Sequence, residues 1–271
     1  MSKENTAVTK KKIKRCKEDV VFDAACFIIL TLVLFVVAYP LYWVIISSIS
    51  APSAVSSGKV LLHPIGFTLK GYAEVFKNDQ VMRGFLNSLI ITFCGVMVNL
   101  IVTLPTSYAL SRSNFSGKKP ITIFYLITMF FGGGLIPTYL VIQRLQMLNT
   151  IWALILPGCL SVYNMIVART FFKSNISEEL YEAAEIDGCT QARFFFQIAL
   201  PLSKAIIAIL VLYYGVGHWN SYFSALVYIS DKAKYPLQLV LRNILITNQT
   251  ALSQTATTAA ARAALQEKQQ L

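Results

Sequence analysis

Five long stretches without a charged side chain constrain this chain more than any other feature. They cover residues 24–49, 85–111, 121–143, 151–168 and 205–230. A membrane-spanning helix needs about 20 mostly apolar residues, because the hydrocarbon layer is about 30 Å thick and each residue rises about 1.5 Å. One such stretch could be the core of a soluble protein, but five in 271 residues predict an all-α, polytopic transmembrane helical bundle.

The position of the charges predicts how the bundle lies in the membrane. Only 14% of the residues are charged, yet the net charge is +11, and seven Lys or Arg residues fall in residues 3–17, ahead of the first apolar stretch. Basic loops stay on the cytosolic side of membranes. We therefore predict a multi-pass protein of the cell membrane with a basic cytosolic tail over residues 1–19, surrounded by membrane lipid and without a nucleic-acid partner.

The remaining segments are assigned to sides by alternation. The short loop 112–119 carries three basic residues and no acid, which suits the cytosol. The polar segment 173–202 falls on the same side, within a predicted transmembrane domain over residues 20–230. Residues 231–271 are predicted to be an external segment with a polar, alanine-rich tail. Residues 243–261 carry no charge but are too rich in Thr, Asn, Gln and Ser to form a lipid-facing helix.

The cytosolic segment 173–202 has the local signals of two short helices. Ser177 is a plausible N-cap with two glutamates in the first turn, where acids suit the helix dipole. Leu180, Ala183 and Ala184 predict one apolar face with small side chains. Asp187 and Gly188 predict a turn, and Thr190 a cap for the second helix. Pro201 is expected to open the fifth span.

The same segment resembles a known signature. Glu182-Ala183-Ala184, then Gly188, Ile198 and Leu200-Pro201, stand at the spacing of the EAA signature in permeases of binding-protein-dependent ABC importers. In that family the two short helices dock into a cleft on a separate ATPase subunit. The alternative is a solvated amphipathic linker. The resemblance implies that the following residues couple ATP hydrolysis to transport: Glu182, Ala183, Ala184, Asp187, Gly188, Ile198, Leu200 and Pro201.

Further motifs resemble the carbohydrate-importer branch, similar to the maltose permeases and closest to permeases for oligosaccharides or glycans from polysaccharides. These are residues 131–137, 149–150, 154–157, 219–220, 235–238 and 241–242. The resemblance implies alternating access and the following partners: a second, homologous permease, two ATPase domains, an extracellular sugar-binding protein and an oligosaccharide substrate. It also implies a sixth span after the last external loop. None is visible, so we expect a shortened chain or divergence at that end.

No enzymatic site is predicted. The chain has no GxxxxGK[ST] phosphate-binding loop and no HExxH zinc motif, and its five cysteines have no CxxC spacing. We therefore expect no cofactor or metal in this chain, with ATP and Mg²⁺ on the partner ATPase. The alternatives are an importer permease for a peptide or an amino acid, an ion-coupled secondary transporter and a membrane-embedded transferase. An ion-coupled carrier usually needs ionisable residues within its spans, and the five stretches have no Asp, Glu, Lys or Arg.

Polar and aromatic side chains within the spans are candidates for the solute pathway, because hydrocarbon gives them no partners. The alternatives are hydrogen bonds between helices and, for Trp219, an anchor at the membrane interface. Residues 132–134 are all glycine, and with Pro105 and Pro137 they predict either hinges or sites of close helix packing. The pathway candidates are Asn99, Tyr163, Asn164, Trp219, Asn220 and Tyr222.

Overall fold

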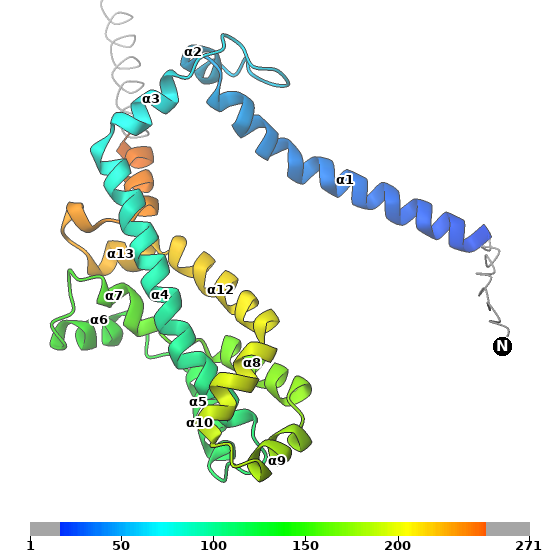
Figure 1. Ribbon diagram of the computed structural model, residues 1–271. Coiled ribbons are helices and arrows are strands. Elements are labelled where there is room, and N and C mark those ends of the chain that lie inside the picture. Colours follow the sequence, from blue (N-terminus) through cyan, green and yellow to red (C-terminus); the bar gives the residue numbers. More distant parts are fainter. Residues whose placement is uncertain (1–16, 248–271) are drawn as a thin grey trace, which may run out of the picture. The chain divides into compact units, whose positions relative to one another are not determined.

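The computed structural model describes residues 17–247, and this part of the chain is helical without a strand. The predicted basic tail before Lys17, including Cys16, and the predicted alanine-rich tail beyond Thr247 lie outside the described residues. The chain divides between Lys77 and Asn78 into two compact units. Figure 1 shows the helices of both, and each unit is described by itself below.

The first unit consists of α1 (Lys17–Ser48), α2 (Pro52–Ser56) and α3 (Lys70–Lys77). Helix α1 is apolar on every side, and nearly all of its large apolar side chains are exposed within this chain. A helix of this kind needs a membrane or a protein around it. Its end is fastened to the following loop, because Trp43 Nε1 donates to the carbonyl of Val60 at 2.8 Å and the Tyr42 hydroxyl donates to that of Leu62 at 2.6 Å.

The second unit is built around α4 (Asp79–Ser111), which packs mainly against α8 (Val162–Asn175) and α12 (Lys204–Trp219). Asn78 caps α4 because its Oδ1 accepts from the backbone amides of Gln80 and Val81. The helix is unbroken through Pro105. It therefore forms a continuous scaffold along which the other helices of this unit are placed (Figure 1).

Three predicted spans are bent pairs of helices. Helices α5 (Lys118–Phe130) and α6 (Leu135–Arg144) meet at 114°, around the three glycines 132–134. Gly134 has a φ of +86°, and no described atom lies within 4 Å of a Cβ at Gly132 or Gly134. In the described part of the chain, these glycines therefore break a helix and do not mark close helix packing.

The fourth predicted span is also interrupted. Helix α7 (Trp152–Ile155) and the short η1 turn (Leu156–Gly158) meet α8 at 52°. Pro157 lies in η1, where it lacks the amide needed to continue a regular helix. Together with α1 and α4, which are long and apolar enough to cross a membrane, the three bent pairs give up to five spans. The number of spans stays a prediction.

The last predicted span begins as expected but is shorter, because α12 runs only from Lys204 to Trp219. Before it the chain continues through α9 (Glu178–Ile186), α10 (Gln191–Phe194), the π-helical turn η2 (Phe195–Ala199) and α11 (Leu200–Leu202), then bends by 80° into α12. Pro201 therefore lies before the bend and does not open α12. The residues up to 230, which we placed in the span, contain a separate helix, α13 (Tyr222–Tyr228).

Beyond α13 the chain forms a turn, η3 (Lys232–Lys234), and an apolar helix, Leu237–Thr247, which is shorter than a span and reaches the end of the described residues. The sequence predicts an external segment here and no membrane-spanning helix, and this short helix leaves that a prediction. Leu237 and Val240 pack against Gly84 of α4, where an added Cβ would lie 3.1 Å from the Val240 side chain. Ser88 Oγ accepts from the Leu237 amide at 2.8 Å. The helix has a local signal, because the apolar residues 237, 240, 241, 244 and 245 follow Pro236 at helical spacing, and tertiary contacts with α4 hold it in place.

Candidate coupling loop and transport pathway

The predicted caps of the two short helices are confirmed. Ser177 Oγ accepts from the Leu180 amide, and Thr190 Oγ1 accepts from the Arg193 amide, both at 3.3 Å. Each cap satisfies an amide that has no partner within its helix. The segment 173–202, which we call the coupling loop, thus contains two helices, α9 and α10, whose starts are set by local sequence.

Gly188 makes the turn between these helices. Its φ is +75°, a left-handed conformation that only glycine adopts without strain. The Gly188 amide donates to the Glu185 carbonyl at 3.0 Å, and the Cys189 amide to that of Ala184 at 2.9 Å. No described atom lies within 4 Å of a Cβ built at Gly188. The turn therefore needs glycine for its backbone conformation and not for lack of space.

The structure divides the predicted coupling residues between two sides of the loop. Glu182, Ala183, Asp187, Gly188 and Pro201 are exposed. The half-buried members Ala184, Ile198 and Leu200 pack against the core. Of the predicted apolar face, Leu180 and Ala183 are exposed and Ala184 is half-buried, and its role in docking stays a prediction. The exposed side of the loop also includes Ile186, whose side chain is 87% exposed. Sequence reasoning missed this residue. A large apolar side chain so exposed at a turn is a candidate contact for a protein partner.

An aromatic cluster joins the coupling loop to the bundle. The Tyr181 ring of α9 meets Phe194 edge to face at 5.3 Å between centroids, and Tyr108 of α4 lies 5.0 Å from Phe195. Tyr108 also meets Phe172 of α8 at 5.7 Å. All five side chains are buried. Packed aromatic rings fix their neighbours' positions, so the base of the loop is held by α4 and α8.

The Asn99 side chain is completely buried, and both polar atoms of its amide group have a hydrogen-bond partner. Its Nδ2 donates to the Gly158 carbonyl at 2.8 Å, and its Oδ1 lies 2.7 Å from His218 Nε2. It links α4, η1 and α12. This is the helix–helix hydrogen bonding that we named as the alternative to a pathway role. A contact between Asn99 and a solute stays a prediction.

A second polar contact lies one helical turn away. Thr103 Oγ1 is 2.8 Å from the Tyr214 hydroxyl, which also accepts from the Ser161 amide at 3.2 Å. One turn further, Ser107 Oγ donates to the Met165 carbonyl at 3.1 Å. Sequence reasoning missed these residues and His218. The signal was the four-residue spacing that places polar residues on one helix face: Asn99, Thr103 and Ser107 on α4, and Tyr214 and His218 on α12.

The other pathway candidates do not form one cluster around a described cavity. Tyr163 is 57% exposed, whereas the neighbouring Asn164 is buried. Trp219 meets Phe85 edge to face at 6.0 Å. Asn220 Nδ2 donates to the Val216 carbonyl at 2.9 Å, and the Arg242 guanidinium lies 5.9 Å from the exposed Tyr222 ring. Their roles in transport stay predictions.

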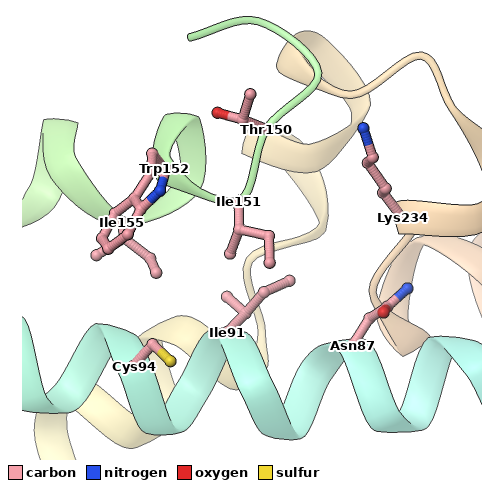
Figure 2. Close-up of a pocket in the computed structure, with 8 residues that line it drawn as sticks. All are labelled: Asn87, Ile91, Cys94, Thr150, Ile151, Trp152, Ile155 and Lys234. Atoms are coloured by element: carbon pink, nitrogen blue, oxygen red, sulfur yellow. The ribbon is translucent and has the colours of Figure 1, made fainter.

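The segments predicted to be external are joined by Asn149. Its Oδ1 accepts from the Asp231 amide at 3.0 Å, its backbone amide donates to the Tyr228 carbonyl at 2.8 Å, and its own carbonyl accepts from Lys234 Nζ at 2.9 Å. Beside it lies a pocket of about 430 Å³ between α4 and α7 (Figure 2). Its lining comprises Asn87, Ile91, Cys94, Thr150, Ile151, Trp152, Ile155 and Lys234.

Removal of the Asn149 side chain is expected to loosen this junction. Asn149 has a φ of +61°, which asparagine tolerates better than alanine, and Asn149→Ala also leaves the Asp231 amide without its partner. We expect a loss of about 1–3 kcal/mol in local stability. Limited proteolysis of the purified protein should cut near residues 229–236 several times faster, while Gln143→Ala, at an exposed position of α6, should leave the rate unchanged. Equal rates in both variants would contradict this role.

These features define the class of the protein: a multi-pass membrane subunit of a transporter, with a helical loop outside the spans that is suited to contact a protein partner. The chain belongs to the family of ABC transporter permease subunits that includes carbohydrate permeases. It is 38% identical over 225 residues to the polygalacturonan/rhamnogalacturonan transport system permease protein YtcP of Bacillus subtilis (strain 168). The match covers 83% of this chain and 78% of YtcP.

Two other proteins show the same relationship. The galactooligosaccharides transport system permease protein GanQ of Bacillus subtilis (strain 168) is 29% identical, over 80% of this chain and 78% of GanQ. A crystal structure of a bacterial ABC transporter involved in the import of the acidic polysaccharide alginate contains a chain with a TM-score of 0.81 and 28% identity. The likeness covers 85% of this chain and 82% of that one. No family model matches the chain.

Proposed function

We propose that this permease imports oligosaccharides or glycans derived from polysaccharides, driven by ATP hydrolysis on a separate subunit. The observation that carries the proposal is the coupling loop, which combines the EAA spacing with an exposed outer face and a left-handed turn at Gly188. The cargo is inferred from relatives whose names specify polygalacturonan or rhamnogalacturonan, galactooligosaccharides and alginate. A peptide or amino-acid cargo is the runner-up.

In this proposal the coupling loop and the basic N-terminus lie in the cytosol. ATP binding and hydrolysis move two ATPase domains, and the exposed face of the loop follows them. The aromatic cluster around Tyr108 passes this motion to α4 and α8, and the polar contacts at Asn99 and Thr103 pass it to α12. The spans then alternate between outward and inward access.

A second, homologous permease is needed to enclose the pathway. Many apolar side chains of α5 and α6 are exposed within this chain, and the buried Asn99 and Thr103 are already bonded to His218 and Tyr214. A water-filled route for an oligosaccharide needs polar walls, which one set of helices does not supply. An extracellular sugar-binding protein would deliver the cargo to the segments around Asn149 and residues 231–236.

Uptake measurements test the cargo. A strain lacking the chromosomal copy would express the permease together with its second permease, ATPase and sugar-binding protein. Cells would be given labelled trisaccharides of galacturonate, alginate or galactose, or a labelled tripeptide. We expect uptake of at least one saccharide and none of the peptide. Uptake of the tripeptide alone would replace the proposed cargo with the runner-up. Uptake that persists after mutation of the ATPase Walker lysine would contradict ATP-driven transport.

A further inference from the structure

The first residue after α4 makes several contacts with the start of α9. Arg112 Nη2 lies 3.2 Å from Glu178 Oε1, and the Arg112 guanidinium lies 3.8 Å from the centroid of the Tyr181 ring. The next residue, Ser113, donates through its hydroxyl to the same Glu178 carboxylate. The Arg112 side chain is only 12% exposed. The end of the second predicted span is therefore joined directly to the coupling loop, through residues outside the EAA signature.

The charges at this junction depend on each other. Glu178 lies in the first turn of α9, where the helix dipole favours a negative charge and disfavours an unpaired cation. Arg112 can approach this helix end because Glu178 compensates its charge and because the Tyr181 ring face attracts a cation. The guanidinium is planar, so it can stack on the ring and pair with the carboxylate at the same time, which a lysine ammonium cannot do.

Arg112 also connects to α5, because its carbonyl accepts from Lys118 Nζ at 3.1 Å. One residue thus links the end of α4, the start of α5 and the start of α9. The aromatic cluster beneath α9 holds the base of the coupling loop against α4 and α8. The ion pair and the ring contact add a second attachment, at the first turn of α9, which restrains α9 against tilting about Tyr181.

We propose that Arg112 is a positioning residue that holds α9 in a fixed orientation on α4, so that movement of the coupling loop becomes movement of the spans. The inference rests on the proposed function of the loop. A hollow of about 360 Å³ lies beside Arg112, lined also by Tyr108, Glu185 and Gln191. The Arg112 guanidinium is paired in charge with Glu178 and lies over the Tyr181 ring, while its buried Nη2 makes no hydrogen bond to a described residue. The two contacts to α9 favour the positioning role over a ligand role.

The experiment compares variants in the complete complex, with its permease partner, ATPase and binding protein reconstituted in vesicles. The readout is the amount of labelled trigalacturonate, trimeric alginate or galactotriose taken up per ATP hydrolysed. We expect Arg112→Gln to lower this ratio at least fivefold in an assembled complex. Arg112→Lys keeps the charge without the stacking and should lie between Arg112→Gln and wild type. Arg144→Gln, at an exposed arginine at the end of α6, is the matched control and should not change the ratio.

Exchanging the charges of Arg112 and Glu178 tests whether their mutual contact, and not the arginine alone, is responsible for the effect. Arg112→Glu and Glu178→Arg should each lower the ratio, and the double variant should recover part of it, because contacting residues give non-additive effects. A wild-type ratio in Arg112→Gln would overturn the proposal. So would failure of both Arg112→Gln and Arg112→Lys to assemble with the ATPase, because that result would make the role one of assembly.

Hydrogen exchange gives a readout that does not depend on the cargo. In the complex without saccharide, the backbone amides of residues 179–183 should exchange at least fivefold faster in Arg112→Gln than in wild type, and unchanged exchange would overturn the proposal. If the wild-type complex takes up none of the three saccharides, the proposed cargo fails, and the exchange measurement still decides the role of Arg112.

Discussion

Gly188→Leu is expected to reduce saccharide uptake about 5- to 30-fold. A left-handed conformation costs a residue with a side chain about 1–2 kcal/mol, equivalent to a factor of about 5–30 in the population of the native turn. Because the turn orients the exposed face of α9, the loss falls on docking to the ATPase. The open space around Gly188 means that the side chain itself causes no clash. Uptake in cells and copurification of the ATPase measure the effect.

Gly188→Asn is the matched variant for this prediction. Asparagine enters the left-handed region more readily than leucine and also has a side chain larger than a hydrogen atom. We therefore expect Gly188→Asn to keep most of the uptake. If Gly188→Leu transported at the normal rate with the ATPase bound, the coupling role of this turn would be wrong. If both variants failed equally, the size of the side chain and not the backbone would be responsible.

Gly95→Ala is expected to destabilise the bundle although alanine favours helices. A Cβ at Gly95 would lie 2.5 Å from His218 Nε2, so the imidazole ring must move and its contact with Asn99 Oδ1 must be lost. Overpacking of this kind costs about 1–3 kcal/mol, which exceeds the gain of about 1 kcal/mol in helix propensity. We expect a lower midpoint of thermal unfolding for the purified protein in detergent.

Gly217→Ala is the control, because no described atom lies within 4 Å of a Cβ at that position of α12. There only the helix propensity changes, so stability should be equal or higher. Combining Gly95→Ala with His218→Ala should cost less than the sum of the two single changes, because removal of the ring makes room for the methyl group. Equal stability of Gly95→Ala and Gly217→Ala would contradict the close packing of His218 on α4.

Signals that act over a few residues could be predicted from the sequence. The apolar stretches, the caps at Ser177 and Thr190 and the turn at Gly188 are local, because each depends on the hydrophobic effect over one helix or on hydrogen bonds within four residues. The EAA spacing belongs to the same kind of signal. The class of protein and its family follow from these features.

Other features depend on residues far apart in the chain. The helix from Leu237 packs against Gly84 and Ser88, about 150 residues earlier. The pairing of Asn99 with His218 and that of Arg112 with Glu178 need the packed bundle. In a membrane, a polar side chain must find a partner inside the protein. The sequence by itself determined which side chains need such partners, and only the tertiary structure decided which ones they found, because the choice depends on which helix faces meet.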